Sequence, residues 1–304
     1  MKHLLKMADL SKEEIESILD LADQLKYEKK NHIPHPLLAG KTLGMIFQKS
    51  STRTRVSFEV GMYQLGGHAL FLSSNDLQIG RGEPVQDTAR VLSRYLDGIM
   101  IRTFAQKEVE DLAAYGSIPI INGLTDFAHP CQVLADLMTI REKYASLDGL
   151  KLAYIGDGNN MANSLIVGCL KMGMKVAVAT PEGYRPDPSV LAFAEGNPNF
   201  LLTDDPVQAV AGADVVYTDT WASMGQEQEK EARLKAFAGY QVNDELLAAA
   251  NPGAMVQHCL PAYRGQEITE EVFEAHATEL FDEAENRLHA QKAVLVKLLG
   301  GKQE

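Results

Sequence analysis

The sequence TLGMIFQKSSTRTR, residues 42–55, joins a short apolar run to a polar turn and then to the start of a helix. Thr42–Phe47 is apolar and short, which predicts a buried strand. A helical pattern follows from about Arg53 to Leu65 and stops at Gly66-Gly67. Strand followed by helix is the repeating unit of a parallel α/β sheet, and this unit recurs along the chain.

The rest of the first half repeats the same alternation. Residues 11–29 are predicted to form a helix, because Ser11 and Glu14 make a capping box ahead of an apolar face. Pro84 is expected in the first turn of a helix that runs to Leu96. Further strands are predicted at residues 69–72, 99–102 and 118–121.

The pattern restarts near residue 150. Strand 151–155 leads through Gly156-Asp-Gly-Asn-Asn to a helix near residues 163–172. The predicted fold is α/β: two open parallel-sheet domains of similar size, with a cleft between them, linked by interdomain helices. The domains are expected at residues 1–140 and 141–285. A C-terminal helix at 286–304 is expected to pack back on the first domain, with packing on the second domain as the alternative that the sequence leaves open. The later strands are predicted at residues 175–179, 200–203, 213–218 and 254–258.

Length and composition limit the function classes. A chain of 304 residues fits two domains of about 150 residues each. A net charge of −12 argues against non-specific nucleic-acid binding, and no apolar run approaches the ~20 residues that span a bilayer. Three widely spaced cysteines indicate neither a disulfide framework nor a zinc site. The cysteine usage fits a reducing compartment, so a cytoplasmic protein is expected, with a processed organellar enzyme as the alternative.

Polar clusters fall at the carboxyl ends of the predicted strands, where open α/β sheets bind ligands. The strongest cluster is Lys49-Ser50-Ser51-Thr52-Arg53-Thr54-Arg55. Amides at a helix start, hydroxyls and arginines together suit a phosphate. The alternative is a capped helix with solvated charges. The segment is not a Walker loop, because no G-x-x-x-x-G-K-[ST] occurs.

Five motifs resemble those of the aspartate/ornithine carbamoyltransferase family, in family order and over nearly the whole chain. The tetrapeptide 51–54 resembles S-x-R-T, and His129-Pro130-Cys131-Gln132 resembles H-P-x-Q. Residues 219–225, 258–261 and 285–287 resemble the D-x-W-x-S-M-G, H-C-L-P and E-N-R motifs of the ornithine branch. The resemblance implies transfer of a carbamoyl group from carbamoyl phosphate to the δ-amine of L-ornithine, giving L-citrulline and phosphate, as in arginine biosynthesis.

The resemblance also implies a donor site in the first domain. Arg102 would touch phosphate and carbonyl oxygen, His129 would donate to the carbonyl oxygen, and Gln132 would bind the carbamoyl amide. Arg102, His129, Asp219 and Cys259 are the implied catalytic residues. The implied carbamoyl phosphate-binding residues are Ser51, Thr52, Arg53, Thr54, Gln78, Arg102, His129, Pro130, Cys131, Gln132, Cys259, Leu260 and Arg287.

The implied acceptor site lies in the second domain and comprises Asn160, Asp219, Ser223 and Met224. Asn160 suits the α-carboxylate and Asp219 the amines, although Asn159-Asn160 could equally be a plain helix cap. Cys259 is not expected to act as a nucleophile, because the acceptor amine already is one. Trp221 is expected on a closing lid, with core packing as the alternative.

The implied reaction is direct attack of the neutral amine through a tetrahedral intermediate, which needs no metal or organic cofactor. The family forms homotrimers with active sites at subunit interfaces, where Gln78 would reach a neighbour's carbamoyl phosphate. The expected partners are the two small-molecule substrates, with no nucleic acid and no membrane.

Three other functions are compatible with parts of the sequence. Gly156-Asp-Gly158 after a strand suggests a nucleotide-dependent dehydrogenase, but Met161 stands where the dinucleotide fingerprint needs a third glycine. A non-enzymatic small-ligand binding protein with two α/β domains is the second alternative. Such a protein would not need His129, Cys259 and Arg287 to converge on the phosphate site. A sibling transferase for putrescine or a modified ornithine is the nearest alternative.

Overall fold

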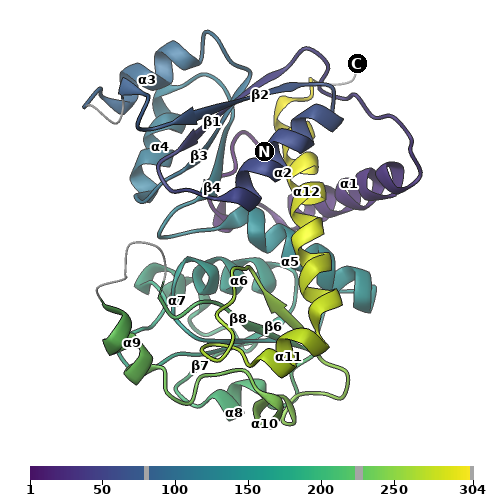
Figure 1. Ribbon diagram of the computed structural model, residues 1–304, viewed down its shortest axis with the longest axis vertical. Coiled ribbons are helices and arrows are strands. Elements are labelled where there is room, and N and C mark those ends of the chain that lie inside the picture. The colour runs from purple at the N-terminus through teal and green to yellow at the C-terminus, as the bar shows by residue number, and fades with distance from the viewer. Residues whose placement is uncertain (79–81, 223–228, 302–304) are drawn as a thin grey trace. The chain divides into compact units, whose positions relative to one another are not determined.

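The computed structural model describes residues 1–78, 82–222 and 229–301. The chain forms two compact units (Figure 1). Unit 1 comprises Met1–Met138 and Asn286–Glu304, and unit 2 comprises Thr139–Glu285. The boundary between the units falls inside two helices, α5 (Pro130–Tyr144) and α12 (Ala277–Leu299). Two α/β domains linked by helices were predicted, and this fold class is confirmed.

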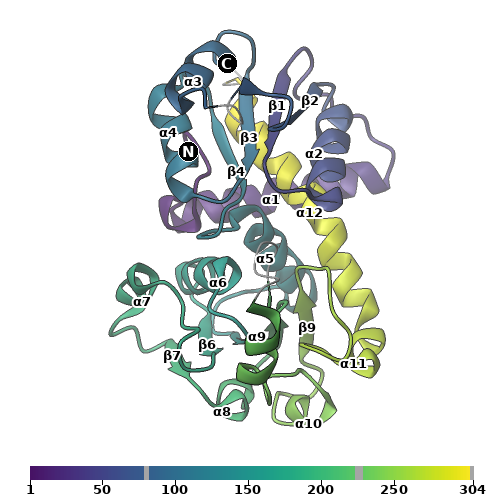
Figure 2. The same cartoon turned by 60° about the vertical axis from the view of Figure 1, so that its left-hand side comes forward.

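Unit 1 contains a four-stranded parallel sheet in the order β2-β1-β3-β4. In two views the sheet lies between α3 and α4 on one side and α2 and α12 on the other (Figures 1 and 2). The strands are β1 (Thr42–Phe47), β2 (His68–Ser73), β3 (Gly98–Arg102) and β4 (Ile120–Leu124). The remaining helices are the 3₁₀ helix η1 (Met7–Asp9), α1 (Lys12–Lys30), α2 (Thr52–Gln64), α3 (Val85–Leu92) and α4 (Gln106–Tyr115).

Unit 2 contains a five-stranded parallel sheet in the order β7-β6-β5-β8-β9. Its central strand β5 is fully buried beyond its first residue, as the apolar run predicts. The strands are β5 (Lys151–Ile155), β6 (Lys175–Ala179), β7 (Phe200–Thr203), β8 (Val215–Thr218) and β9 (Met255–His258). The helices are α6 (Asn160–Lys171), α7 (Pro188–Ala194), α8 (Pro206–Val210), α9 (Lys230–Ala236), α10 (Asp244–Leu247) and α11 (Glu270–Ala275).

The two glycines after β5 serve the packing of the turn. A Cβ on Gly158 would lie 2.3 Å from the backbone nitrogen of Pro186, so only glycine fits there. The Gly158 amide also donates to the carbonyl of Tyr184. Gly156 has φ of 146°, a conformation that L side chains rarely adopt. This close approach of two chain segments explains Gly-Asp-Gly without a dinucleotide.

Several predicted boundaries were wrong for local reasons. β4 lies at 120–124 rather than 118–121, because Pro119 has no N–H to donate to the sheet. Pro84 is the N-cap of α3, with an extended ψ of 137°, and α3 ends at Leu92 rather than Leu96. α12 begins at Ala277 instead of 286, since no proline or glycine interrupts the intervening residues. Within the described part of the chain, no helix is long and apolar enough to cross a membrane.

Candidate active site

The polar turn after β1 forms the start of α2. The Ser51 hydroxyl oxygen accepts a hydrogen bond from the Thr54 amide at 3.2 Å and so caps the helix. The first turn of α2 contains no acidic residue. Thr52 and Arg53 are exposed, whereas Thr54 is buried. An exposed arginine beside helix-start amides with no competing carboxylate is suited to binding a phosphate.

Arg102 ends β3, next to this turn. Its carbonyl accepts hydrogen bonds from the amides of Gln48 and Lys49, at 2.9 and 3.4 Å, so the turn after β1 is joined to the end of β3. The pairing of β3 with β4 shifts register between Ile101 and Arg102. Arg102 is buried to 6% exposure, which is unusual for an arginine away from a binding site or ion pair.

His129 is buried just before α5, among three arginines. Burial and the charges of Arg287, Arg102 and Arg53 hold its pKa well below 6.5. The imidazole is therefore neutral at neutral pH. A neutral imidazole keeps one N–H, which can donate to a carbonyl oxygen without accepting a proton. The three arginines supply the positive charge that a phosphate requires.

Arg287 on α12 connects the residues of this cluster. One guanidinium nitrogen donates to Gln132 Oε1 at 2.6 Å, and another lies 3.4 Å from the Thr54 hydroxyl. Gln132 in turn donates from Nε2 to Asp136 at 2.8 Å. Unit 1 thus brings together the helix start, Arg102, the pair His129 and Gln132, and Arg287 from four places in the sequence.

Two predicted donor-site residues, Cys131 and Gln78, have surroundings that differ from those of this cluster. Cys131 is buried, its thiol donates to the Asn122 carbonyl at 3.4 Å, and burial raises its pKa to about 12. Its side chain is therefore a packed, protonated thiol. Gln78 is exposed, and its carbonyl accepts from the Glu83 amide. Pro130 is the first residue of α5.

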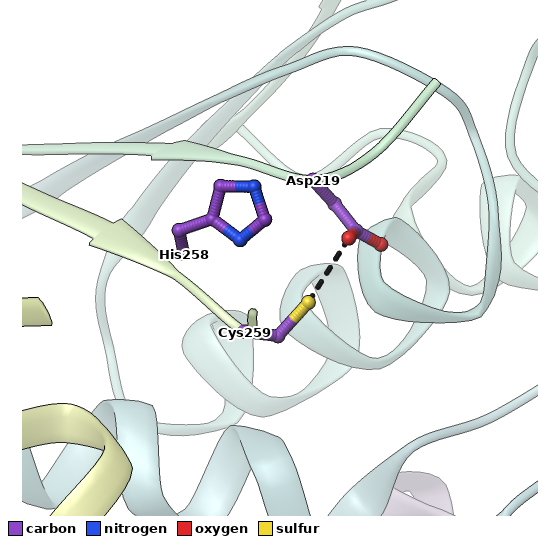
Figure 3. Close-up of side chains that lie close together, drawn as sticks. All are labelled: Asp219, His258 and Cys259. Atoms are coloured by element: carbon purple, nitrogen blue, oxygen red, sulfur yellow. Dashed lines mark hydrogen bonds between the residues drawn. The ribbon is translucent and has the colours of Figure 1, made fainter. Parts of the chain in front are cut away.

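The acceptor-side residues lie at the carboxyl ends of three strands of unit 2. Asp219 follows β8, and Cys259 follows β9 (Figure 3). The Cys259 thiol donates to Asp219 Oδ1 at 3.0 Å. The same oxygen accepts from the Thr220 amide at 2.7 Å. A buried carboxylate held beside a thiol can bind an amine or ammonium.

Asp219, His258 and Cys259 also place their potential ligand atoms within 4.8 Å of one another, as metal sites do (Figure 3). Sequence spacing gave no sign of this cluster, since it joins two strands. His258 Nδ1 accepts from the Leu260 amide at 2.9 Å, and Nε2 is 3.0 Å from Glu267. Both ring nitrogens are thus engaged, which favours a hydrogen-bond network that orients the Cys259-Leu260 turn. Leu260 has φ of 56°.

Asn159 was missed as a site residue by sequence reasoning. α6 begins at Asn160, three residues earlier than predicted, because Asn159 caps it. The Asn159 amide also donates to Asp219 Oδ2 at 2.8 Å. Asn160, the predicted α-carboxylate ligand, is the first residue of the helix, and its carbonyl accepts from Ser164. Asn159 is therefore a helix cap, as the alternative interpretation held, and it also contacts Asp219.

Trp221 was predicted on a closing lid, and this was wrong. Its side chain is buried in the core of unit 2 and stacks on Phe237, with ring centroids 5.7 Å apart and planes at 16°. Its carbonyl accepts from Arg233 at 2.9 Å, and Arg233 also forms a 2.8 Å ion pair with Asp157. Burial raises the pKa of Asp157 to about 6, against the lowering effect of Arg233. Ser223 and Met224 lie outside the described residues.

Comparison with known proteins agrees with the motifs. Residues 2–142 match the carbamoyl-P binding domain of the aspartate/ornithine carbamoyltransferase model, and residues 148–298 match its Asp/Orn binding domain. An ornithine carbamoyltransferase of Carboxydothermus hydrogenoformans is 58% identical, over 98% of each chain. The solved ornithine carbamoyltransferase of Pyrococcus furiosus is 55% identical, with a TM-score of 0.95 over 99% of this chain and 98% of that one. The chain therefore belongs to the aspartate/ornithine carbamoyltransferase family.

Proposed function

We propose that this protein transfers the carbamoyl group of carbamoyl phosphate to the δ-amine of L-ornithine, giving L-citrulline and phosphate. The observation that carries the proposal is the convergence of Arg53, Arg102 and Arg287 on the buried, neutral His129 beside an acid-free helix start. Such a site offers charge to a phosphate and a neutral donor to a carbonyl. Family membership supports carbamoyl phosphate with aspartate or ornithine, and the similar proteins named ornithine carbamoyltransferase favour ornithine.

The donor is assigned to unit 1. Ser51, Thr52, Arg53 and Thr54 bind its phosphate in this proposal, and Arg102 and His129 donate to its carbonyl oxygen. Both donors strengthen as negative charge develops on that oxygen, and one such donor is typically worth about 10²–10³ in rate. Contacts to the carbamoyl group are assigned to Gln132, Cys259, Leu260 and Arg287, with Pro130 and Cys131 shaping the start of α5.

The acceptor is assigned to unit 2. Asp219 orients the δ-amine together with Cys259, and Asn160, Ser223 and Met224 are assigned to the amino-acid head. The amine nitrogen attacks the carbonyl carbon. The new C–N bond gives a tetrahedral intermediate whose former carbonyl oxygen carries the negative charge. The C–O bond to phosphate then breaks, and the leaving phosphate takes the proton lost by the amine. The rate should therefore rise with pH as free ornithine loses its ammonium proton.

Assembly and cellular placement complete the proposal. We assign the chain to a cytoplasmic homotrimer in which Gln78 reaches the neighbouring subunit's carbamoyl phosphate. Its exposure on the loop after β2 is compatible with that role. Sedimentation of the purified protein tests the trimer. Gln78→Ala should lower activity without changing the sedimentation coefficient if the loop contributes to a neighbouring site.

The decisive assay compares acceptors. The protein is given carbamoyl phosphate with ornithine or with putrescine, and citrulline, carbamoylputrescine and phosphate are measured. Citrulline formation with kcat/KM at least tenfold above that for putrescine supports the proposal. A preference for putrescine would reassign the acceptor, and no carbamoyl transfer to either amine would reject the function.

A further inference from the structure

The carboxylate of Asp219 is held by neighbours from three strand ends. Oδ1 accepts from the Thr220 amide at 2.7 Å and from the Cys259 thiol at 3.0 Å. Oδ2 accepts from Asn159 Nδ2 at 2.8 Å. The Thr220 hydroxyl also reaches Oδ1, at 3.5 Å. Each oxygen of an ionised carboxylate has two acceptor positions, so Oδ2, which accepts one bond, has room for an incoming amine in a fixed direction. The bond from Asn159 is the one that fixes Oδ2.

The orientation of the Asn159 amide is determined by its surroundings. Its Oδ1 accepts from the amides of Met161 and Ala162, at 2.9 and 3.3 Å, and from the Tyr154 hydroxyl at 3.2 Å. Three donors around one atom require an oxygen there. The NH2 group must therefore face Asp219.

Asparagine is the residue type that can serve both partners. Asparagine, aspartate and serine are about equally good helix caps. Aspartate would place a second carboxylate against Asp219, and serine is too short and has no amide to reach it. Capping α6 therefore explains an oxygen at position 159, but it does not explain the amide.

We infer that Asn159 is a positioning residue for the acceptor amine, acting through Asp219. The inference rests on the proposed function, since Asp219 is assigned there to the ornithine amine. The cap fixes Asn159 to the rigid start of α6, and its amide transmits that fixed position to the carboxylate. Tyr154 completes the arrangement as a buried donor to Asn159. Burial and the nearby Asp219 raise the Tyr154 pKa well above 10, so the hydroxyl keeps its proton.

Two variants separate the cap from the bridge. Asn159→Ser keeps a capping oxygen and removes the amide, and Asn159→Asp keeps the oxygen and replaces the amide with a carboxylate. Both should bind carbamoyl phosphate normally in calorimetry. Asn159→Ser should keep Tm near wild type, whereas repulsion between two carboxylates should lower Tm in Asn159→Asp. Both should lose roughly 10- to 100-fold in kcat/KM for ornithine, as expected for a lost hydrogen bond to a charged group.

The pH profile supplies a readout that a purely structural role would not move. In Asn159→Asp the acidic limb of kcat/KM for ornithine should shift to higher pH, because adjacent carboxylates disfavour each other's ionised forms. Asn159→Ser should show the rate loss with a smaller shift, because it removes one donor to the carboxylate and adds no second negative charge. Asn243→Asp is the matched control, because Asn243 also caps a helix of unit 2, with its oxygen 2.9 Å from the Leu246 amide. Its kinetics should equal wild type.

The outcomes are separable. Wild-type protein that forms no citrulline rejects the proposed function and this inference with it. Wild-type citrulline formation with unchanged ornithine kinetics in both Asn159 variants overturns the inference alone. Equal losses of carbamoyl phosphate affinity and ornithine use, or a Tm fall with no kinetic change, also overturn it, because they indicate a structural role. If Asn159→Ser is too unstable to assay, Asn159→Asp and Tyr154→Phe decide the question by the same criteria.

Discussion

Arg287 donates a 2.6 Å hydrogen bond to Oε1 of Gln132, which joins α12 to the start of α5 although 155 positions separate the two residues. The same guanidinium reaches the Thr54 hydroxyl in the first turn of α2. A planar group with several fixed donors can serve both partners at once, whereas a lysine ammonium on a flexible stem cannot hold this geometry.

Arg287→Lys should therefore lower kcat/KM for carbamoyl phosphate by about 10²–10³-fold, the usual cost of losing a positioned donor. The reason is geometry rather than charge, since lysine keeps the charge. Steady-state kinetics and calorimetric binding of carbamoyl phosphate measure the effect. Lys297→Met on the same helix, whose ammonium contacts the Ser17 hydroxyl, is the control and should match wild type. Wild-type affinity in Arg287→Lys would remove Arg287 from the donor site.

Asp219→Asn should damage ornithine use and spare the donor. It removes the charged acceptor for the amine N–H, and a hydrogen bond to a charged group contributes about 1.5–3 kcal/mol. We expect kcat/KM for ornithine to fall about 30-fold, with carbamoyl phosphate binding in calorimetry unchanged. Loss of donor binding in this variant would argue that Asp219 maintains the fold instead of the acceptor.

Lys292 should make the free energy of unfolding rise with pH in the alkaline range. Its ammonium is fully buried and contacts His35 Nε2 at 2.6 Å and Gln64 Oε1 at 3.0 Å. Burial lowers its pKa from 10.5 to about 8. Between these values the unfolded chain binds more protons at this site than the folded chain, so this group's contribution to stability rises with pH, by at most about 1.4 kcal/mol per pH unit.

Urea unfolding from pH 7.5 to 10.5 measures this effect as the difference between wild type and Lys292→Met. The other titrating groups are shared, so they cancel in the difference. The stability of wild type relative to the variant should increase across the window and level off above it. A difference that stays flat with pH would contradict the low pKa.

Trp221→Ala should destabilise unit 2 by about 3–5 kcal/mol, because it opens a cavity against Phe237 in a packed core. Chemical unfolding followed by circular dichroism measures the loss. Phe193→Ala, at an exposed aromatic of the same unit, should change stability by no more than about 0.5 kcal/mol. Trp221 is the one tryptophan of the chain, so its wild-type emission should shift to longer wavelength on unfolding. A small effect of Trp221→Ala would restore the lid interpretation.

Apolar runs made the fold predictable. β1, β5, β6 and β7 lie within the bounds expected from sequence, since each is a short hydrophobic segment between polar turns. The predicted starts of helices were less accurate. The side-chain cap of Asn159 starts α6 earlier than expected, and α12 starts earlier because no proline or glycine interrupts the residues before 286. Pro119 shifted β4 by removing a donor from the ladder.

The side-chain partners of the site were not predictable in the same way. Asn159 and Asp219 stand 60 positions apart and meet because β5 pairs with β8. That register is a property of the folded sheet. Trp221 was misassigned because a glycine-containing loop suggested exposure, whereas its aromatic partner Phe237 comes from the far end of α9.

The discontinuity of unit 1 has a consequence for synthesis. Its last segment starts at Asn286, while unit 2 is continuous in the chain and complete at Glu285. A ribosome that has translated residue 285 has therefore supplied every residue of unit 2, but it has not yet supplied Arg287, which reaches back to Thr54 and Gln132. Domains usually fold in the order in which they are translated. Here the half that begins at the N-terminus must be the last to finish.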